Sequence, residues 1–296
     1  MKNNKLIRLL DPTPRVCPNR QPPRFPPAGS EFLREVVANV SKPSVACTVD
    51  GYIVNSSGAI TRLFFKREFE LLQSGAKELD IANALTNEES VQKTKIVLNS
   101  VARLLGCGVD YLFSPAGYPY GNASELKMLL ISVDDIDSGR ARRRYVDYHG
   151  LAEHIRFYRG RSFSNPKPIT VATSAIECFL ANEFIESGSA DPFPGDLDFI
   201  LIRDGVARLI GEFKTHNLPS PIDNESCENY QSEDWRRLDV LLKLSSKLNC
   251  KLFYIFWGPR HQEIKIQEIT PSRKIVQSTV LEKNAKILAD FFESNA

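Results

Sequence analysis

The sequence lacks paired cysteines, histidine clusters and long apolar runs. None of its six cysteines forms a Cys-x-x-Cys pair, so zinc-knuckle and iron–sulfur spacings are absent. No stretch approaches the roughly 18 apolar residues that span a bilayer. Nothing resembles a secretory signal, because the N-terminus breaks into prolines after a short apolar patch. These absences favour a cytoplasmic protein with free thiols and no membrane association.

Basic side chains are abundant but unevenly placed. The net charge of the 296-residue chain is only +2, and its 42% of hydrophobic residues is typical of a globular protein with a sizeable core. Residues 1–25 carry six basic side chains against the single acid Asp11. A second group of seven arginines follows later: Arg140, Arg142, Arg143, Arg144, Arg156, Arg159 and Arg161. Such groups fit a phosphate-binding surface and an ordinary solvated face equally well.

Composition along the chain divides it into three parts. Residues 1–30 form an arm rich in proline and arginine, in which helix is blocked. Residues 31–138 are predicted to be an N-terminal α+β region, and the acidic stretch 134–139 marks its end. Residues 139–296 are predicted to be a second domain. The fold class is therefore mixed α/β, with a helical block over residues 66–105 in the first domain.

That helical block follows a predicted helix over 32–40 and predicted strands over 45–54 and 59–65. Its three predicted helices resemble LuxR-type helix-turn-helix DNA-binding domains, and this likeness rests on one pattern of about 40 residues. The pattern is Arg67-Glu68…Gly75…Ile81-Ala82…Leu85…Ser90-Val91. However, the third helix begins with Glu88 and Glu89, which would repel phosphates. Three helices packed on a small sheet are the favoured alternative, and a transcription regulator would need an exposed basic helix here.

Charged residues interrupt two otherwise apolar runs near residue 200. The runs are Asp196-Leu197-Asp198-Phe199-Ile200-Leu201-Ile202 and Glu212-Phe213-Lys214. Charged groups are almost never buried unless they are paired or bound to a metal. Asp204-Gly205 between the runs predicts a hairpin turn. A three-residue loop over 204–206 would place Asp198 across from Glu212, with Cβ atoms about 4.5–5.5 Å apart.

Two facing carboxylates repel each other unless a cation lies between them. Strand alternation places Lys214 on the same face as Glu212. Hard oxygen ligands without a nearby Cys or His pair favour Mg²⁺ or Mn²⁺. Asp196 is an alternative ligand on the first strand. A predicted helix over 174–187 adds Glu177, whose simpler interpretation is a capping box with Ser174.

At these residues the chain resembles the PD-(D/E)xK nuclease superfamily, over roughly residues 170–260. The matching pattern is a helical Glu177, then Asp198 on one strand, then Glu212-Phe213-Lys214 on its antiparallel neighbour. The resemblance implies a restriction-endonuclease-like core, in which a mixed sheet is flanked by helices. It also implies a Mg²⁺- or Mn²⁺-dependent nuclease, acting on DNA in preference to RNA.

The resemblance further assigns roles to single residues. Asp198, Glu212 and Glu177 would be metal ligands, and Lys214 would complete the catalytic set. Glu183 is the fallback for Glu177. Gln231 lies where some relatives carry a Gln-x-x-x-Tyr motif, but the tyrosine is missing here. The implied partner is nucleic acid, and a homodimer or a partner protein stays open.

The remaining elements are ordinary. We predict a helix over 234–248, neighbouring strands over 251–257 and 263–269, and a closing helix over 280–292. His216 and His261 are expected at the surface, because neither has a partner at metal spacing. The rival to a nuclease is a non-catalytic nucleic-acid-binding or assembly protein that keeps the fold with its site unused.

Overall fold

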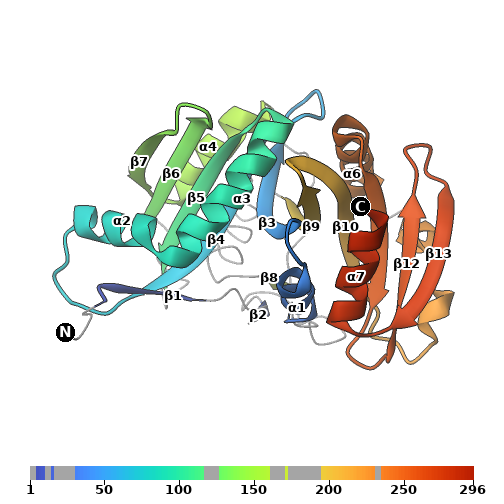
Figure 1. Ribbon diagram of the computed structural model, residues 1–296. Helices are drawn as coiled ribbons and strands as arrows, with labels where there is room; N and C mark the ends of the chain where they lie inside the picture. Colours follow the sequence, from blue (N-terminus) through green and yellow to red (C-terminus); the bar gives the residue numbers. More distant parts are fainter. Residues whose placement is uncertain are drawn as a thin grey trace. The chain divides into compact units, whose positions relative to one another are not determined.

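The protein is a mixed α/β protein in which contacts divide the chain into two compact units (Figure 1). The computed structural model describes residues 5–10, 15–16, 31–116, 127–160, 171–172, 195–230 and 235–296. Unit 1 contains Met1–Pro27 and Asp50–Pro194, and unit 2 contains Ala28–Val49 and Gly195–Ala296. Within the described residues, no helix has the length and apolar character needed to cross a membrane.

Unit 1 is built on a mixed sheet. Its main strands are β3 (Val45–Val54, of which the second half belongs to this unit), β4 (Ile60–Leu71), β5 (Gly108–Pro115), β6 (Met128–Asp135) and β7 (Arg140–Val146). β4 and β5 are parallel, whereas the β3–β4, β5–β6 and β6–β7 pairs are antiparallel. β1 (Ile7–Leu10) also pairs with the end of β4, and β2 (Arg15–Val16) pairs with β8 (Val171–Ala172).

Helices cover both faces of the unit 1 sheet (Figure 1). α4 (Tyr148–Arg159) packs its buried Leu151 and Ile155 against even-numbered strand residues such as Phe64 and Leu112. α3 (Glu89–Leu105) lies on the opposite face, with α2 (Glu78–Asn87) beside it. α3 ends at Gly106, whose positive φ of 65° is the left-handed conformation that closes a helix.

The prediction of a helix at residues 66–72 was wrong, because β4 continues as a strand to Leu71. Phe65 and Phe69 are four residues apart and imitate a helical stripe. The strand is largely buried because helices cover both faces of this sheet, and β5 and β1 pair along its edges. A strand in that position loses the alternation by which it would be recognised. The three-helix pattern therefore does not form, although helices do form at 78–87 and 89–105.

The strands of unit 2, which carry the predicted site, are also mixed in direction and belong to the same 11-stranded sheet. In spatial order they are β13 (Ile275–Glu282), β12 (Glu263–Ile269), β11 (Lys251–Trp257), β10 (Val206–Thr215) and β9 (Gly195–Arg203). β10 and β11 are parallel, and α6 (Trp235–Leu248) connects them after two short 3-10 turns at Ile222–Asn224 and Cys227–Tyr230. α1 (Glu31–Asn39) and α7 (Ala285–Asn295) contact each other and cover one face.

The β9–β10 hairpin reaches the predicted register by an unexpected route. Val206 pairs with Arg203, so Asp204-Gly205 is a two-residue turn and the predicted three-residue loop was wrong. A bulge at Arg208 then adds one residue to β10, and Ile210 pairs with Ile200 as expected. The register beyond the bulge is therefore the predicted one. Odd-numbered Phe199 and Leu209 enter the core under α1 and α7.

Most of the other predicted elements of unit 2 are present. The helices at residues 32–40 and 234–248 and the strands at 251–257 and 263–269 agree with α1, α6, β11 and β12. The closing helix begins later than predicted, at Ala285, because residues 275–282 form the edge strand β13. This strand alternates half-buried and exposed residues. The predicted domain boundary at 138 stays a prediction, although residues 136–139 lie in the turn between β6 and β7.

Candidate functional site

Asp198, Glu212 and Lys214 lie on the face of the unit 2 sheet opposite the α1–α7 core. Glu212 follows Gly211, which pairs with Phe199, so the register brings Glu212 beside Asp198. Asp198 Oδ2 accepts a hydrogen bond of 2.8 Å from the Phe213 backbone N–H. Lys214 Nζ lies 3.0 Å from Glu212 Oε1. The hairpin therefore gathers these three side chains at one end of the strands.

A cation that the sequence gave no reason to expect lies among these acids. Arg237 of α6 places its Nε 2.6 Å from Glu212 Oε1 and its Nη1 2.6 Å from Asp196 Oδ1. Arg237 Nη2 lies further, 3.7 Å, from Asp198 Oδ1. Arg237 comes from the helix that crosses over between β10 and β11, so only the folded chain brings it to the hairpin. The guanidinium thus joins three carboxylates.

Three carboxylates and two cations are described at this centre. Among the described residues, Asp196, Asp198 and Glu212 face two cations, Arg237 and Lys214. The Glu212 side chain is only 1% exposed and that of Asp198 is 17% exposed. Burial, and then the charges of Glu212 and Asp196, raise the pKa of Asp198 well above its usual value. The site therefore favours the arrival of a further cation or a proton.

The predicted metal ligands are only partly within the described chain. Glu177, its fallback Glu183 and Gln231 lie outside the described residues. No group of three or more His, Cys, Asp or Glu side chains in the described ranges has the geometry to hold a metal ion. Asp198 and Glu212 supply hard carboxylate oxygens, which suit a divalent cation. Entry of such an ion requires the Arg237 side chain, which is 25% exposed, to move outward.

Lys214 is enclosed by aromatic rings. Its Nζ lies 5.6 Å from the ring centre of Tyr230 and 5.8 Å from that of Tyr254. Both distances are within the range of a cation–π contact. Tyr230 in turn donates a hydrogen bond of 2.9 Å to Glu225 Oε2. The ammonium group is therefore held by Glu212 on one side and by two aromatic faces on another.

The expectation that His216 lies at the surface was wrong. Its side chain is 3% exposed, and Nδ1 lies 2.7 Å from Glu225 Oε1. Its Nε2 lies 2.8 Å from the Ser220 carbonyl oxygen. A histidine directly after a strand end is buried here because the segment that follows β10 folds back over it. Sequence spacing gave no signal, since the partners are a carboxylate and a carbonyl and not a second metal ligand.

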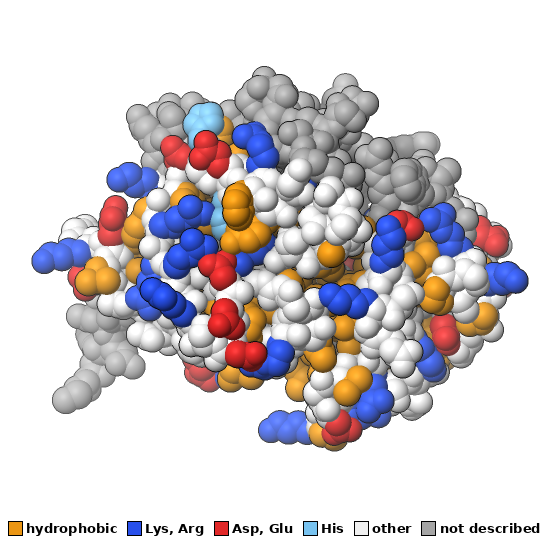
Figure 2. Space-filling view, turned by 90° about the horizontal axis from the view of Figure 1, so that it is seen from above, with side chains coloured by type: hydrophobic (Ala, Val, Ile, Leu, Met, Phe, Trp, Pro, Cys, Tyr) orange, Lys and Arg blue, Asp and Glu red, His pale blue; other side chains and the backbone are white. Residues whose placement is uncertain are grey.

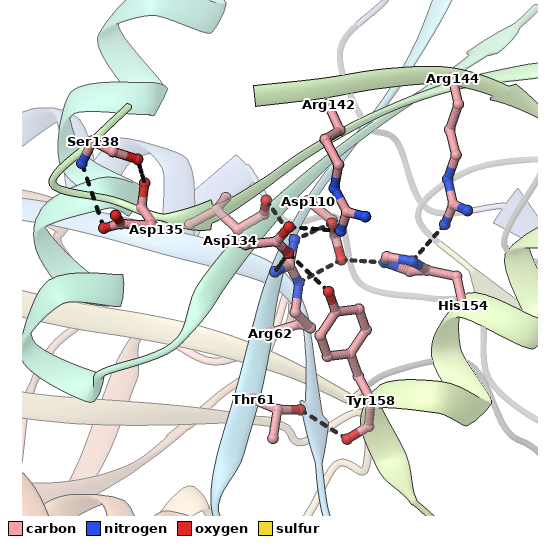
Figure 3. Close-up of polar contacts among 11 residues, drawn as sticks. Thr61, Arg62, Asp110, Asp134, Asp135, Ser138, Arg142, Arg144, His154 and Tyr158 are labelled. Atoms are coloured by element: carbon pink, nitrogen blue, oxygen red, sulfur yellow. Dashed lines mark hydrogen bonds and ion pairs between the residues drawn. The ribbon is translucent and has the colours of Figure 1, made fainter. Parts of the chain in front are cut away.

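Unit 1 contains a second buried charge cluster, which the sequence analysis missed (Figure 3). Arg62 and Asp110 are 1% and 0% exposed. The Arg62 guanidinium makes two bonds to the Asp110 carboxylate, one of them 3.0 Å from Nε to Oδ2. Arg62 Nη1 also donates to Asp134 Oδ1 at 2.8 Å. The signal was present, because both residues interrupt apolar strands as Asp198 does.

His154 of α4 completes this cluster (Figure 3). Arg144 Nη2 lies 2.6 Å from His154 Nδ1, and Asp110 Oδ2 lies 2.7 Å from Nε2. Arginine only donates hydrogen bonds, so Nδ1 must accept and the proton must be on Nε2. Burial opposes ionisation of Asp110, but hydrogen bonds from His154 and Arg62 outweigh it and lower its pKa. This cluster is therefore internally satisfied.

The Arg62 side chain of this cluster is closely packed against its neighbours. A Cβ atom added at Gly108 would collide with the Arg62 guanidinium and would lie 2.7 Å from the Val133 carbonyl oxygen. Glycine is thus required for β5 to pass the buried arginine. Arg62 also stacks on Tyr158, with 4.6 Å between the guanidinium carbon and the ring centre. These contacts indicate a structural role for the cluster.

The Arg-rich segment forms the edge strand β7. Its Arg142 pairs with Asp134 at 2.6 Å, and Arg144 contacts His154. Arg143, on the other face of the strand, donates to Asn83 of α2. Lys and Arg side chains, interspersed with acids, occupy the part of the surface on the left of Figure 2. The segment is thus exposed and basic, but some of its charge is already paired.

Comparison with known proteins adds little. No protein-family model matches the chain, and no curated protein matches it either. The crystal structure of the sex pheromone staph-cAM373 precursor is 8% identical, with 93% of this chain and 84% of that chain covered, at a TM-score of 0.17. The sex pheromone precursor from Lactobacillus salivarius subsp. salivarius UCC118 is 7% identical, with 82% and 68% covered, at 0.19. Likeness at these scores carries no argument about fold or function.

Proposed function

We propose that the chain is a metal-dependent nuclease whose centre is formed by Asp198, Glu212 and Lys214. One observation carries the proposal: two adjacent carboxylates lie at the end of a buried hairpin, where burial, and then the charges of Glu212 and Asp196, raise the pKa of Asp198. Perturbed pKa values cluster at functional sites. The lysine 3.0 Å from Glu212 adds a group suited to phosphate chemistry.

The arrangement of elements around the hairpin supports this proposal. β9 and β10 are antiparallel, and α6 then crosses to β11, which is parallel to β10. This order is the one expected for a restriction-endonuclease-like core, in which the acidic residues lie on the first two of these strands. The predicted helix bearing Glu177 would complete that core and lies outside the described residues.

Each described residue has a distinct role in the proposed chemistry. Asp198 and Glu212 would hold Mg²⁺ or Mn²⁺, an ion that polarises a scissile phosphate and lowers the pKa of water. Asp198 is oriented by the Phe213 N–H, which binds Oδ2, while Oδ1 lies 3.7 Å from the Arg237 guanidinium. The Lys214 ammonium would donate to a phosphate oxygen or hold the attacking water. Tyr230 and Tyr254 limit its movement.

DNA is the substrate we favour over RNA, with the basic residues of the N-terminal arm and of 140–161 as phosphate contacts. Binding through such contacts weakens steeply with salt. We also infer a cytoplasmic location from the free thiols. The six cysteines are scattered along the sequence without a Cys-x-x-Cys pair.

A cleavage assay tests the proposal. Single-stranded DNA, duplex DNA and RNA are incubated with the full chain and Mg²⁺ or Mn²⁺, with EDTA as the blank. We expect cleavage that Asp198→Asn, Glu212→Gln and Lys214→Ala each reduce by about a hundredfold or more, the scale on which catalytic groups act. Asp204→Asn is the matched control, because it makes the same change at the far end of the same hairpin. Full activity of Asp198→Asn would refute the mechanism.

The rival function is a non-catalytic nucleic-acid-binding protein, and the position of Arg237 favours it. A guanidinium that permanently joins Asp196, Asp198 and Glu212 would replace the metal. The two functions differ in the effect of Arg237→Ala on metal affinity. The nuclease proposal expects saturable Mn²⁺ binding by the wild type and tighter binding by the variant. The rival expects salt-sensitive DNA binding, no Mn²⁺ binding by the wild type and no cleavage. Asp239→Ala, two residues further along α6, is the control for loss of a helix charge.

A further inference from the structure

The strand β13 forms a free edge of unit 2. It is the last strand in the order of the sheet, and no strand in the described part of the chain pairs with its outer side (Figure 1). A free edge presents unpaired backbone N–H and C=O groups, and proteins commonly blunt it with charged side chains or proline. Residues 275–281 of β13, Ile-Val-Gln-Ser-Thr-Val-Leu, contain neither. By contrast β7, at the other end of the sheet, carries four arginines in seven residues.

Two valines are exposed on one face of β13. Its residues alternate between half-buried and exposed, and Val276, Ser278 and Val280 belong to the exposed set. Val276 and Val280 are 58% and 38% exposed. The register with β12 shifts by one residue at Val276, which marks a bulge, and bulges are another way to blunt an edge. The alternation nevertheless continues through Val276, so the two valines stay on the same face.

The end of this strand brings two acids together. Glu282 lies directly opposite Glu263 of β12, and like charges in that position destabilise a sheet. Neither glutamate forms an ion pair with another of the described residues. Two neighbouring lysines are bonded elsewhere, Lys265 to Asp223 and Lys283 to a backbone carbonyl oxygen. A cation supplied from outside the unit would relieve this repulsion.

Antiparallel pairing of β13 with a second copy of itself supplies that cation. Most homodimers have a two-fold axis, and an axis through Ser278 pairs residues that are equally far from it in sequence. Lys274 then lies opposite the partner's Glu282, so two Lys–Glu pairs form across the axis. Val276 lies opposite the partner's Val280, and each copy covers the exposed valines of the other. The strand is thus complementary to itself in both charge and apolar side chains.

We propose that the chain forms a homodimer in which two β13 strands pair antiparallel about an axis at Ser278. The pairing extends over residues 274–282 and forms about eight to ten backbone hydrogen bonds between the copies. The contact uses no residue of the proposed nuclease centre. It therefore stands whether or not the chain cleaves nucleic acid.

Sedimentation equilibrium of the full chain tests the proposal. One strand from each copy makes a small contact, so we expect a dissociation constant between about 1 and 100 µM. Ser278→Lys would place two lysines face to face on the axis, and it should weaken association at least about tenfold. Ser246→Lys, the same change at an exposed serine of α6, is the matched control. It should alter the dissociation constant by no more than about twofold.

Charge reversal tests the register. Lys274→Glu and Glu282→Lys each turn both Lys–Glu pairs into pairs of like charge, because the axis makes every substitution count twice. Each should weaken the dimer about tenfold. The double variant, with Lys274→Glu and Glu282→Lys together, exchanges the two charges and should restore the wild-type dissociation constant. Circular dichroism shows whether each variant is folded.

Four results would overturn the proposal. The first is a wild type that stays monomeric at about 1 mM, which would leave this edge to a strand from another protein. The second is an equal effect of Ser278→Lys and Ser246→Lys. The third is a double variant that associates no more tightly than the single ones. The fourth is an assembly larger than a dimer.

Discussion

Two clusters of charged residues lie within strands of this protein, and they balance their charges in opposite ways. In unit 1, Asp110 receives hydrogen bonds from Arg62 and His154, and its pKa is lowered despite complete burial. In unit 2, Asp198 shares one guanidinium with two other acids, and its pKa is raised. The same sequence signal, a charged residue in an apolar strand, thus marks a carboxyl with a lowered pKa in one case and a carboxyl with a raised pKa in the other.

The largest change in stability is expected from a substitution in the unit 1 cluster. Asp110→Asn would leave Arg62 buried without a full counter-charge, and we expect the free energy of unfolding to fall by about 3–5 kcal/mol. Urea unfolding followed by circular dichroism measures this loss. Asp137→Asn, which changes an exposed acid paired with Arg103, should stay within about 1 kcal/mol. A small loss for Asp110→Asn would mean that the cluster is not the satisfied network described above.

Metal addition should stabilise unit 2 alone. Both tryptophans of the chain, Trp235 and Trp257, belong to unit 2, so their fluorescence reports its unfolding. At a Mg²⁺ concentration a hundred times its dissociation constant we expect a gain of about 2.7 kcal/mol. Mg²⁺ should not raise the free energy of unfolding of Asp198→Asn, whereas it should stabilise Asp204→Asn as it does the wild type. If the unfolding midpoint of the wild type, followed by tryptophan fluorescence, does not change with Mg²⁺ or Mn²⁺, the non-catalytic rival is favoured.

In the absence of metal, Asp198→Asn should stabilise unit 2 at neutral pH. The substitution removes a largely buried acid that lies beside two others, and we expect a gain of about 0.5–2 kcal/mol, the range of single stabilising substitutions. The corresponding change in unit 1, at Asp110, has the opposite sign. Tryptophan fluorescence in urea with EDTA measures the difference. A loss of stability here would show that Arg237 already balances the centre.

The two clusters should also respond oppositely to pH. Asp198 has a raised pKa in the folded state, so the folded form holds more protons above pH of about 4. Its contribution to stability is therefore present at low pH and is lost as the pH rises through the folded-state value. Asp110 has a lowered pKa, and its contribution is lost as the pH falls below about 4. The pH profiles of the Asp198→Asn and Asp110→Asn variants, each subtracted from the wild type, should have opposite slopes.

The smallest effect is expected at the edge of the unit 1 cluster. Arg142 pairs with Asp134, but the two side chains are 66% and 46% exposed. Solvent screens such a pair, so Arg142→Ala should change the free energy of unfolding by no more than about 1 kcal/mol. A loss of stability as large as that of Asp110→Asn would show that Arg142 belongs energetically to the buried cluster.

Local patterns allowed much of the fold to be predicted. The turn at Asp204-Gly205 and the strands beside it were confirmed, as were α1, α6, β11 and β12. The facing of Asp198 and Glu212 was reached through a wrong loop length, because the unforeseen bulge at Arg208 restored the register. Residues 66–71 were misassigned because pairing with β5 and β1 decides strand formation there, and burial of both faces removes the alternation from the sequence.

By itself the sequence determined which side chains of the hairpin share a face, since turn chemistry and strand alternation act over a few residues. Only the tertiary structure decided what surrounds them. Arg237 is 25 residues from Glu212 and 41 from Asp196 along the chain, and it reaches both because α6 crosses between parallel strands. His154 likewise reaches Asp110 across 44 residues. The charge balance of a buried group depends on such distant partners, so the hairpin pattern identified the acids and the fold determined the pKa shift of Asp198.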